Sequence, residues 1–280
     1  MKAKRIVQHI APGLTLVVSL AAAAVVAASP AAAESVLAQY SVRLIGLPLG
    51  TATLASRIEP ASYQVEANAR LTGVATLVSN SRGAATASGL LSQGKVAPNA
   101  YATTSSNSKM TRTVRIGMVA GNVRASEITP PFDEGPGRVP LSENHKRSII
   151  DPLSALVMPV PGSGPVVGPA ACDRTIPVFD GWTRFDVNLN YVGVRSVKTK
   201  GYAGPVAVCS ARYVPVAGHR PDRAGTKFMA ENKNIEVWLA PVGETRVVMP
   251  YRISVATMIG TTVIEAQEFS VAAGTKAAQR

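Results

Sequence analysis

The chain has 280 residues, 46% of them hydrophobic and 5% aromatic, and its formal net charge is +12, from 29 basic and 17 acidic residues. This length is sufficient for one large β domain or two small ones. The basic residues are scattered, with no dense run and few interleaved aromatic residues, which argues against a nucleic-acid partner.

The N-terminus carries the features of an export signal. Three basic residues fall within the first five positions, an apolar run covers residues 14–28, and small residues at 29–33 fit an A-x-A cleavage site. The apolar run is shorter than the roughly 20 residues of a membrane-spanning helix, which favours cleavage over an uncleaved anchor. We therefore predict a signal peptide over residues 1–33, cleaved between Ala33 and Glu34, and export to the bacterial periplasm.

The charge that remains after cleavage bears on the expected partners. Loss of the leader leaves 26 basic and 17 acidic residues, a net charge of +9. Such a chain is attracted to anionic envelope surfaces such as phospholipid or lipopolysaccharide, so peripheral contact with a membrane surface is one expectation. Ordinary exposure to solvent on the outer faces of strands explains most of the scattered Lys and Arg residues equally well.

The first part of the mature chain predicts antiparallel strands, because apolar and polar residues alternate with a period of two between turn residues. Strands are expected over residues 40–45, 51–58, 63–71, 113–119 and 123–128, with turns at 46–50 and 59–62. The last two strands flank Ala-Gly-Asn at 120–122. Gly and Asn tolerate the positive φ angles of a hairpin turn, which makes this hairpin signal strong.

Prolines and glycines interrupt the β pattern between residues 130 and 169, where each proline removes a backbone donor from a ladder. Within this break, residues 151–158 predict a short helix, because Asp151 can cap its free amide groups and Pro152 suits the first helical position. The apolar residues that would share one face of this helix are Leu153, Leu156 and Val157.

The β pattern resumes in the last third of the chain. Strands are expected over residues 176–179, 183–191, 206–216, 235–239, 247–259 and 263–271, with turns at 180–181 and 260–261. The predicted fold is mainly β: about ten to twelve strands in a curved antiparallel meander that forms a half-open barrel or sandwich, with one short helix near residues 151–158. We expect a single all-β domain over 34–271, with a subdivision at 130–169 left open, and a flexible tail over 272–280.

The two cysteines, Cys172 and Cys209, predict a structural disulfide. In an oxidising compartment an even pair without C-x-x-C spacing is typical of such a bond. A metal site would need His or carboxylate ligands at suitable spacing, and none flanks these cysteines. A redox-active pair is the alternative, although catalytic cysteines usually lie close together in sequence.

No catalytic motif stands out in the sequence. G-x-S-x-G, H-E-x-x-H, a phosphate-binding loop and a dinucleotide fingerprint are all missing. His145 and His219 lie in loop-like surroundings, and Asp180-Gly181 is better explained as a turn than as a catalytic carboxylate. Assignment as an enzyme therefore stays uncertain and leans towards no, with no catalytic residue, metal or cofactor predicted.

A binding role fits the predicted fold better, since a curved sheet with an apolar interior commonly holds a hydrophobic ligand. The large side chains expected near such a cavity are Trp182, Trp238, Phe185, Tyr191 and Met249. Ordinary core packing is the competing interpretation for each of them.

The order of several landmarks resembles one known family. These are the opening YSVRLIGLPLG at 40–50, a strand headed by Tyr63, DPLSA at 151–155 and Phe-Asp-Gly at 179–181. Over nearly the whole mature chain they resemble the exported bacterial family catalogued as domain of unknown function 3108. The resemblance implies a periplasmic or envelope-associated protein with a curved antiparallel β fold, and it carries no activity or catalytic residues.

The leading hypothesis from the sequence is a periplasmic, non-enzymatic envelope protein that binds a lipid, glycan or protein partner in the concavity of a curved sheet. One alternative is a hydrolase that acts on an envelope polymer through Asp, Ser or Tyr residues brought together by folding. Another is an interaction module that joins an envelope assembly through an exposed strand edge.

Overall fold

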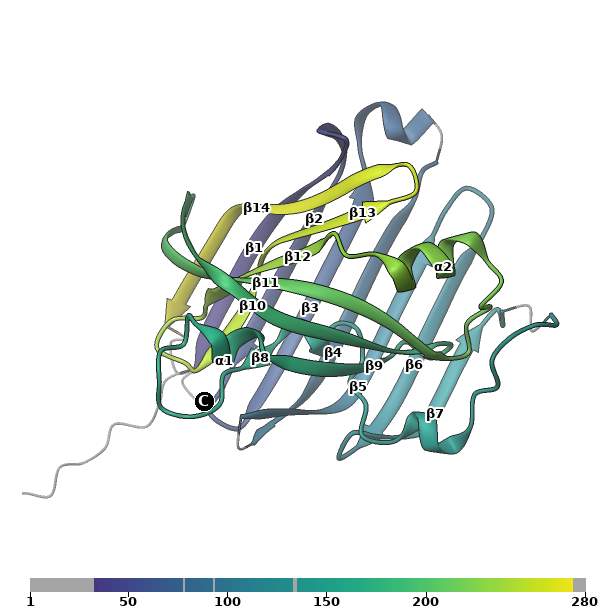
Figure 1. Ribbon diagram of the computed structural model, residues 1–280, viewed down its shortest axis with the longest axis horizontal. Helices are drawn as coiled ribbons and strands as arrows, with labels where there is room; N and C mark the ends of the chain where they lie inside the picture. Colours follow the sequence, from purple (N-terminus) through teal and green to yellow (C-terminus); the bar gives the residue numbers. More distant parts are fainter. Residues whose placement is uncertain (1–32, 78, 93, 133–134, 274–280) are drawn as a thin grey trace, which may run out of the picture. The chain divides into compact units, whose positions relative to one another are not determined.

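A computed structural model describes residues 33–77, 79–92, 94–132 and 135–273. Residues 1–32 of the leader predicted over 1–33, and residues 274–280 of the predicted tail, lie outside the described residues. The described part of the chain is mainly β, as predicted (Figure 1).

One antiparallel sheet contains all the strands. The strands of the first half are β1 (Glu34–Leu44), β2 (Leu47–Ile58), β3 (Ser62–Leu71), β4 (Arg82–Ser92), β5 (Lys95–Ser106), β6 (Thr111–Val119) and β7 (Asn122–Thr129). Those of the second half are β8 (Met158–Pro159), β9 (Arg174–Phe179), β10 (Arg184–Thr199), β11 (Tyr202–Ala217), β12 (Ile235–Pro241), β13 (Val247–Thr257) and β14 (Gly260–Ala273). The α-helices are α1 (Pro169–Cys172) and α2 (Ala224–Glu231), and the 3-10 helices are η1 (Gly73–Leu77), η2 (Glu143–Lys146) and η3 (Ser154–Leu156).

The strand order makes the sheet a meander with a single junction between its halves. It runs β7-β6-β5-β4-β3-β2-β1-β14-β13-β12-β11-β10-β9, with β8 paired to β13. Consecutive strands are therefore neighbours in the sheet from β1 to β7 and from β9 to β14, and β14 lies beside β1. Since β7 and β9 are not paired to each other, the sheet is not closed, as the half-open prediction requires.

Two hairpin turns have the backbone that short β-hairpins prefer. Ala120 and Gly121 have φ angles of 50° and 73°, and the predicted hairpin of β6 and β7 is confirmed. At the β1–β2 turn, Ile45 and Gly46 have φ angles of 51° and 79°. This two-residue turn is shorter than the predicted turn over 46–50, so residues 47–50 belong to β2.

The local predictions for helices and one turn differ from the structure. Residues 151–158 form only the 3-10 helix η3, because Met158 and the residue after it pair with β13 as β8. The two α-helices α1 and α2 were not predicted. Near the C-terminus, Gly260 opens β14 instead of forming the turn, since β13 already ends at Thr257.

Side chains alternate across β1–β6 and define two faces of this part of the sheet. Buried residues form the core face: Val36, Leu54, Val65, Ala87, Tyr101 and Ile116. Residues adjacent to them in sequence form the open face: Leu37, Ala55, Glu66, Thr86, Ala102 and Gly117. The open face is half-buried or exposed and is rich in small and polar residues.

The second half of the sheet packs on the core face. Figure 1 shows β9–β11 crossing in front of β3–β6, and one hydrophobic cluster joins the core-face residues to Phe179, Met249 and Phe269 of the second half. A second cluster lies on the other side of β9–β13 and includes the end of α1. The molecule therefore has two apolar layers, one between the two halves of the sheet and one beneath α1 and the segment that precedes it.

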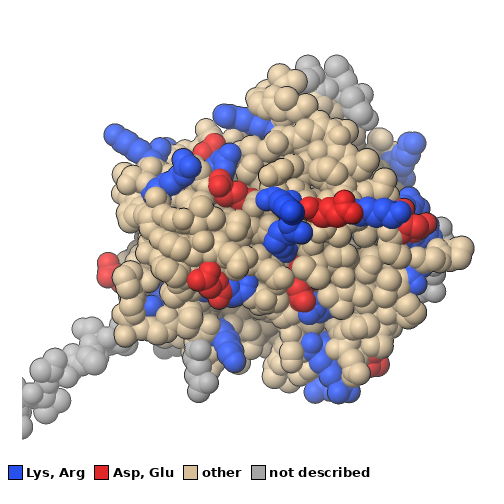
Figure 2. All heavy atoms as spheres, in the orientation of Figure 1, with Lys and Arg blue, Asp and Glu red and all other residues tan. Residues whose placement is uncertain are grey.

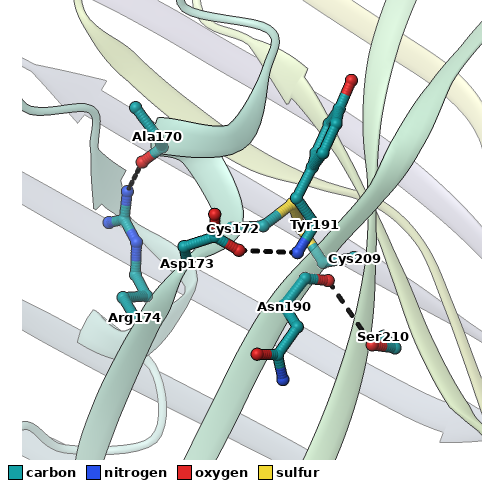
Figure 3. The surroundings of a disulfide bond; sticks show 8 residues. All are labelled: Ala170, Cys172, Asp173, Arg174, Asn190, Tyr191, Cys209 and Ser210. Atoms are coloured by element: carbon teal, nitrogen blue, oxygen red, sulfur yellow. Dashed lines mark hydrogen bonds between the residues drawn. A yellow bond between two sulfur atoms is a disulfide. The ribbon is translucent and has the colours of Figure 1, made fainter.

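The predicted disulfide is present and lies in the second apolar layer. Cys172, at the end of α1, is bonded to Cys209 of β11, and both residues are fully buried (Figure 3). Asp173 continues this attachment, because its Oδ1 accepts a hydrogen bond of 2.7 Å from the backbone N–H of Tyr191 in β10. The disulfide thus fastens the segment between β8 and β9 onto the long hairpin of β10 and β11.

Candidate functional site

The D-P-L-S segment that contributed to the family resemblance forms a buried hydrogen-bonded turn. The Asp151 carboxylate accepts bonds through Oδ1 from the backbone N–H groups of Leu153 at 3.0 Å and Ser154 at 2.8 Å. The predicted capping role of Asp151 is therefore confirmed, although the helix is a single 3-10 turn. The Tyr63 hydroxyl of β3 donates to Ser154 Oγ at 2.7 Å, which ties the turn to the sheet.

This cluster of Tyr63, Asp151 and Ser154 is closed to solvent. Asp151 and Ser154 have no exposed surface, and Tyr63 is 1% exposed. Burial raises the pKa of the Asp151 carboxyl, although its hydrogen bonds with Ser154 and with backbone amides oppose the shift. Burial likewise raises the pKa of the Tyr63 phenol, so this hydroxyl stays protonated and acts as a donor.

The Phe-Asp-Gly segment forms the turn between β9 and β10, as predicted. Asp180 Oδ1 accepts from the backbone N–H groups of Trp182 at 2.8 Å and Thr183 at 2.6 Å, and Oδ2 accepts from the Thr183 hydroxyl at 2.6 Å. Gly181 has a φ of +96°, and a Cβ at this position would lie 2.6 Å from Val114 Cγ1 of β6. The glycine is therefore needed both for the turn and for close contact with the first half of the sheet.

The two segments lie next to each other and hold the halves of the sheet together. Ile150 forms a parallel bridge with Val178 of β9, and its carbonyl accepts a hydrogen bond of 3.0 Å from the N–H of Phe179. The D-P-L-S segment is thus bonded to Tyr63 of β3, and the Phe-Asp-Gly segment is packed on β6. We call this pair of turns, residues 150–154 and 179–183, the interlayer lock.

A hollow lies where the second half of the sheet leaves the core face uncovered. Its volume is about 570 Å³, and its lining comes from β1–β6, the loop after β5, the residue before β4, and β14. Ala52, Ala69 and Gly83 are cross-strand neighbours on β2, β3 and β4 and form a floor of small residues. The other apolar side chains that line it are Val42, Leu71, Met110 and Ile264. We call this region the core-face hollow.

A longer groove of about 990 Å³ runs across the open face. Register pairs place its residues in two rows that cross the sheet from β14 to β6, with Ser88, Ala100 and Gly117 in one and Thr86, Ala102 and Arg115 in the other. Its exposed long side chains are Leu37, Arg57, Gln64, Glu66 and Arg115. This groove carries charges of both signs, whereas the charged residues that line the core-face hollow, Arg70, Arg82 and Arg112, are all basic.

The structure separates the five side chains that were predicted to surround one cavity. Met249 is fully buried in the first apolar layer and Trp238 packs against that layer, whereas Phe185 and Tyr191 pack against the second layer. Trp182 lies at the β9–β10 turn, between the Phe132 ring and the Arg138 guanidinium. None of the five lines the core-face hollow or the open-face groove, so they do not form one binding site, and no motif in the sequence pointed to the residues that do line these hollows.

Charge and metal-ligand chemistry add little to the definition of a site. On the face shown in Figure 2, Lys and Arg are scattered and interspersed with Asp and Glu. Within the described ranges no three His, Cys, Asp or Glu side chains gather in a way that could hold a metal ion. In the same part of the chain, no helix has the length and apolar character needed to span a membrane.

These observations define an all-β protein with one open antiparallel meander whose second half is locked over the first. The chain belongs to the family described as "Protein of unknown function (DUF3108)", whose model matches residues 39–267, which confirms the resemblance. A solved structure titled "Crystal Structure of Beta-barrel-like Protein of Domain of Unknown Function DUF1849 from Brucella abortus" is similar, with 6% identity and a TM-score of 0.46 over 88% of this chain and 100% of that chain. No curated protein sequence matches the chain.

Proposed function

We propose that this protein is exported to the periplasm and acts there as a non-enzymatic envelope protein that binds a lipid in the core-face hollow. The observation that carries the proposal is the floor of small residues, Ala52, Ala69 and Gly83. These residues lie on the core face, and a few residues further along each strand the same face is densely packed. An apolar face that continues beyond its covering layer needs another apolar group to cover it.

The size and chemistry of the hollow suit an acyl chain. About 570 Å³ lies within the range of about 300–1,000 Å³ that is typical of small-molecule pockets. Each methylene group that leaves water contributes roughly 0.8 kcal/mol, so a chain of about ten methylenes offers several kcal/mol after the cost of ordering it. A glycan would gain less from the floor, which offers methyl groups, although residues with hydroxyl side chains and the arginines Arg70, Arg82 and Arg112 also line the hollow.

A hydrolase is the second candidate, because folding does bring Asp, Ser and Tyr side chains together at the interlayer lock. Tyr63 Oη and Ser154 Oγ lie 2.7 Å apart, and the pKa of Asp151 is raised. Against this function, all three residues are closed to solvent, and none lines the core-face hollow or the open-face groove. Asp151 Oδ1 and the Tyr63 hydroxyl already hold the turn, and Asp151 Oδ2, which has no hydrogen-bond partner among the described residues, is buried, so binding is the better-supported proposal.

Native mass spectrometry of the protein purified from the periplasmic fraction tests the proposal. We expect a mature chain that begins at Glu34 and carries an added mass that organic extraction removes. Ala69→Phe fills the hollow and should abolish the added mass. Ala84→Phe places the same ring on the opposite face one strand away and should leave the added mass unchanged.

Two results would count against the proposal. A bare mass in the wild-type protein, with no uptake of added phospholipid, would remove the lipid ligand. Equal loss of the added mass in both variants would show that the lipid does not occupy this hollow. A chain that keeps residues 1–33 would contradict the export step alone.

A further inference from the structure

Another hollow lies on the open face of the sheet, at the end where β3 stops and β4 begins. Its volume is about 860 Å³, within the range of about 300–1,000 Å³ that is typical of small-molecule pockets. Strands β2–β5 form its floor, and the rest of its lining comes from the segment between β3 and β4. We call this region the arginine hollow, after Arg70 and Arg82, which line it.

The register of the strands places the floor residues of the arginine hollow in two rows that cross the sheet. One row holds Thr51, Arg70, Arg82 and Ser106, and the next holds Thr53, Asn68, Ala84 and Thr104. These residues alternate with those of the core face, so their side chains lie on the opposite face of the sheet. Since neighbouring strands are about 4.8 Å apart, each row is about 14 Å long. This length suits an extended ligand better than a single small ion.

Arg70 and Arg82 form a directly opposed pair of like charges. They are Cα partners in the antiparallel register of β3 and β4, and both residues are exposed. The Cβ atoms of such a pair lie about 4.5–5.5 Å apart, and like charges in this arrangement destabilise a sheet. Neither guanidinium has a hydrogen bond, an ion pair or a ring contact with another described residue. The pair therefore costs stability and offers two free guanidinium groups to a ligand.

The carboxylates near the arginine hollow do not neutralise this pair. Arginines are the charged residues of the lining, which has a net charge of +2. Glu66 lies four residues before Arg70 on β3, about 13 Å away, and its Oε1 accepts a hydrogen bond of 3.3 Å from Asn68. Glu265 of β14 continues the row of Arg70 three strands away, and it lies 3.8 Å from Arg252 Nε. Both carboxylates are thus outside ion-pair distance of the arginine pair and have partners of their own.

We propose that the arginine hollow binds an acidic oligosaccharide. Guanidinium groups match a carboxylate or a phosphate in geometry as well as in charge. The hydroxyl and amide side chains of the rows both donate and accept hydrogen bonds, as sugar hydroxyl groups do. The lining is also more polar than that of the core-face hollow or the open-face groove. An acyl chain would leave the arginines unpaired, and a nucleic acid would find no aromatic side chain in the lining on which a base could stack.

The arginine hollow is independent of the lipid proposal above. Some residues, Arg70 and Arg82 among them, line both hollows, because only the sheet itself separates the two. The side chains of the two rows nevertheless lie on the open face, whereas the floor of the core-face hollow lies on the other. The protein could therefore bind a sugar here and carry no acyl chain, or carry an acyl chain and bind no sugar. Failure of one proposal leaves the other standing.

Isothermal titration calorimetry at low ionic strength tests the proposal with two acidic sugars, trigalacturonate and trehalose 6-phosphate, and with neutral trehalose and inorganic phosphate as reference ligands. The test variant is Arg82→Gln, with Arg43→Gln as the matched control. Arg43 is exposed on β1, loses the same charge and lines none of the three hollows. We expect Arg82→Gln to weaken binding of the acidic sugar about tenfold or more, and Arg43→Gln to change it less than about twofold. Since Arg82→Gln also removes the contact between like charges, its midpoint of urea denaturation should equal or exceed that of the wild type.

A second pair of variants tests the site without a change of charge. Ala84 lies in the second row, between Asn68 and Thr104, and is exposed. Ala84→Phe therefore fills the arginine hollow and should abolish sugar binding. Ala69→Phe places the same ring on the core face and should leave sugar binding unchanged, the reverse of the pattern expected for the lipid.

The acidic probes identify the anionic group of the sugar. Binding of trigalacturonate alone identifies a carboxylate, and binding of trehalose 6-phosphate alone identifies a phosphate ester. The proposal is overturned if neither acidic sugar binds, or if trehalose binds as tightly as its 6-phosphate. Inorganic phosphate that binds as tightly as the acidic sugars would also overturn it, because the site would then recognise an anion and no sugar. Equal effects of Arg82→Gln and Arg43→Gln would leave only the general attraction of a basic protein for anions.

Discussion

Replacement of Asp151 tests whether the interlayer lock is structural. Asp151→Ala removes the acceptor of the two N–H groups bonded at 3.0 and 2.8 Å and leaves them buried. Each unpaired buried amide costs about 1–3 kcal/mol, and the release of the buried carboxylate offsets part of that cost. We expect the free energy of unfolding to fall by about 2–4 kcal/mol at pH 7.5, measured by urea denaturation.

Asp151→Asn separates the hydrogen bonds of this side chain from its charge. The amide oxygen can still accept from both N–H groups, while the cost of burying a charge disappears, so we expect the stability at pH 7.5 to change by less than about 1 kcal/mol or to rise. Asp222→Asn, in an exposed loop, is the matched control and should be neutral. Equal destabilisation by the Ala and Asn variants at pH 7.5 would refute the argument, because it would show that the ionised carboxylate itself holds the lock.

The sign of the pH dependence follows from the raised pKa of Asp151. Because burial raises the folded-state pKa above the ordinary value of 3.8, the protonated carboxyl favours the folded state. Its stabilising contribution is complete below pH 3.8 and is lost as the pH rises through the folded-state pKa. The wild-type protein should therefore lose stability relative to Asp151→Asn between pH 4 and neutrality, and a stability difference that does not vary with pH would contradict the shift.

Two further predictions concern the connections between layers. Gly181→Ala should lower the free energy of unfolding by about 1–3 kcal/mol in thermal or urea denaturation, because φ is +96° and Val114 must move. The control, Gly137→Ala, should cost less, because Gly137 also has a positive φ but no neighbour within 4 Å. Replacement of both Cys172 and Cys209 by Ser opens a loop of 38 residues and should lower the free energy of unfolding by about 4 kcal/mol on the chain-entropy model, compared with the oxidised wild-type protein. Compared with the reduced wild-type protein, the double variant should show no such loss.

The sequence predicted eleven of the fourteen strands of the described residues from a local signal, and it did not predict β4, β5 or β8. Alternation along β2, β3 and β6 reflects burial of one face, and this pattern survives whatever strand lies beside them. The helices depend on longer-range contacts. Residues 151–158 have a helical pattern, but Met158 pairs with β13 and forms a strand. Conversely, α2 forms in a segment whose sequence does not favour a helix, with a glycine at position 225 and no acidic residue in the first turn.

The hollows could not be predicted, because they depend on how far the second half of the sheet extends over the first. Ala69 and Val65 lie on the same face of β3, four residues apart, yet Val65 is buried and Ala69 is exposed. Alternation identifies the face of both residues but not the edge of the covering layer.

The family landmarks acquire a physical explanation from the interlayer lock. Asp151 and Asp180 each use a side-chain oxygen to accept from two backbone N–H groups two and three residues further on. Both turns therefore present fixed backbone to the first half of the sheet, one towards Tyr63 and one towards Val114. A meander of this length needs such fixed points, because an open sheet has no closing strand pair to set the position of its second half.

The same argument explains why binding sites would lie beside the lock rather than in it. The lock uses Asp151 Oδ1, the Tyr63 hydroxyl and Ser154 Oγ to position one layer on another, and Asp151 Oδ2, which has no hydrogen-bond partner among the described residues, is buried as well. Beside the lock, the covering layer ends at the core-face hollow. If this view is correct, variants of the lock should change stability and variants of Ala69 should change binding, and a variant of Ser154 that altered lipid affinity at unchanged stability would contradict it.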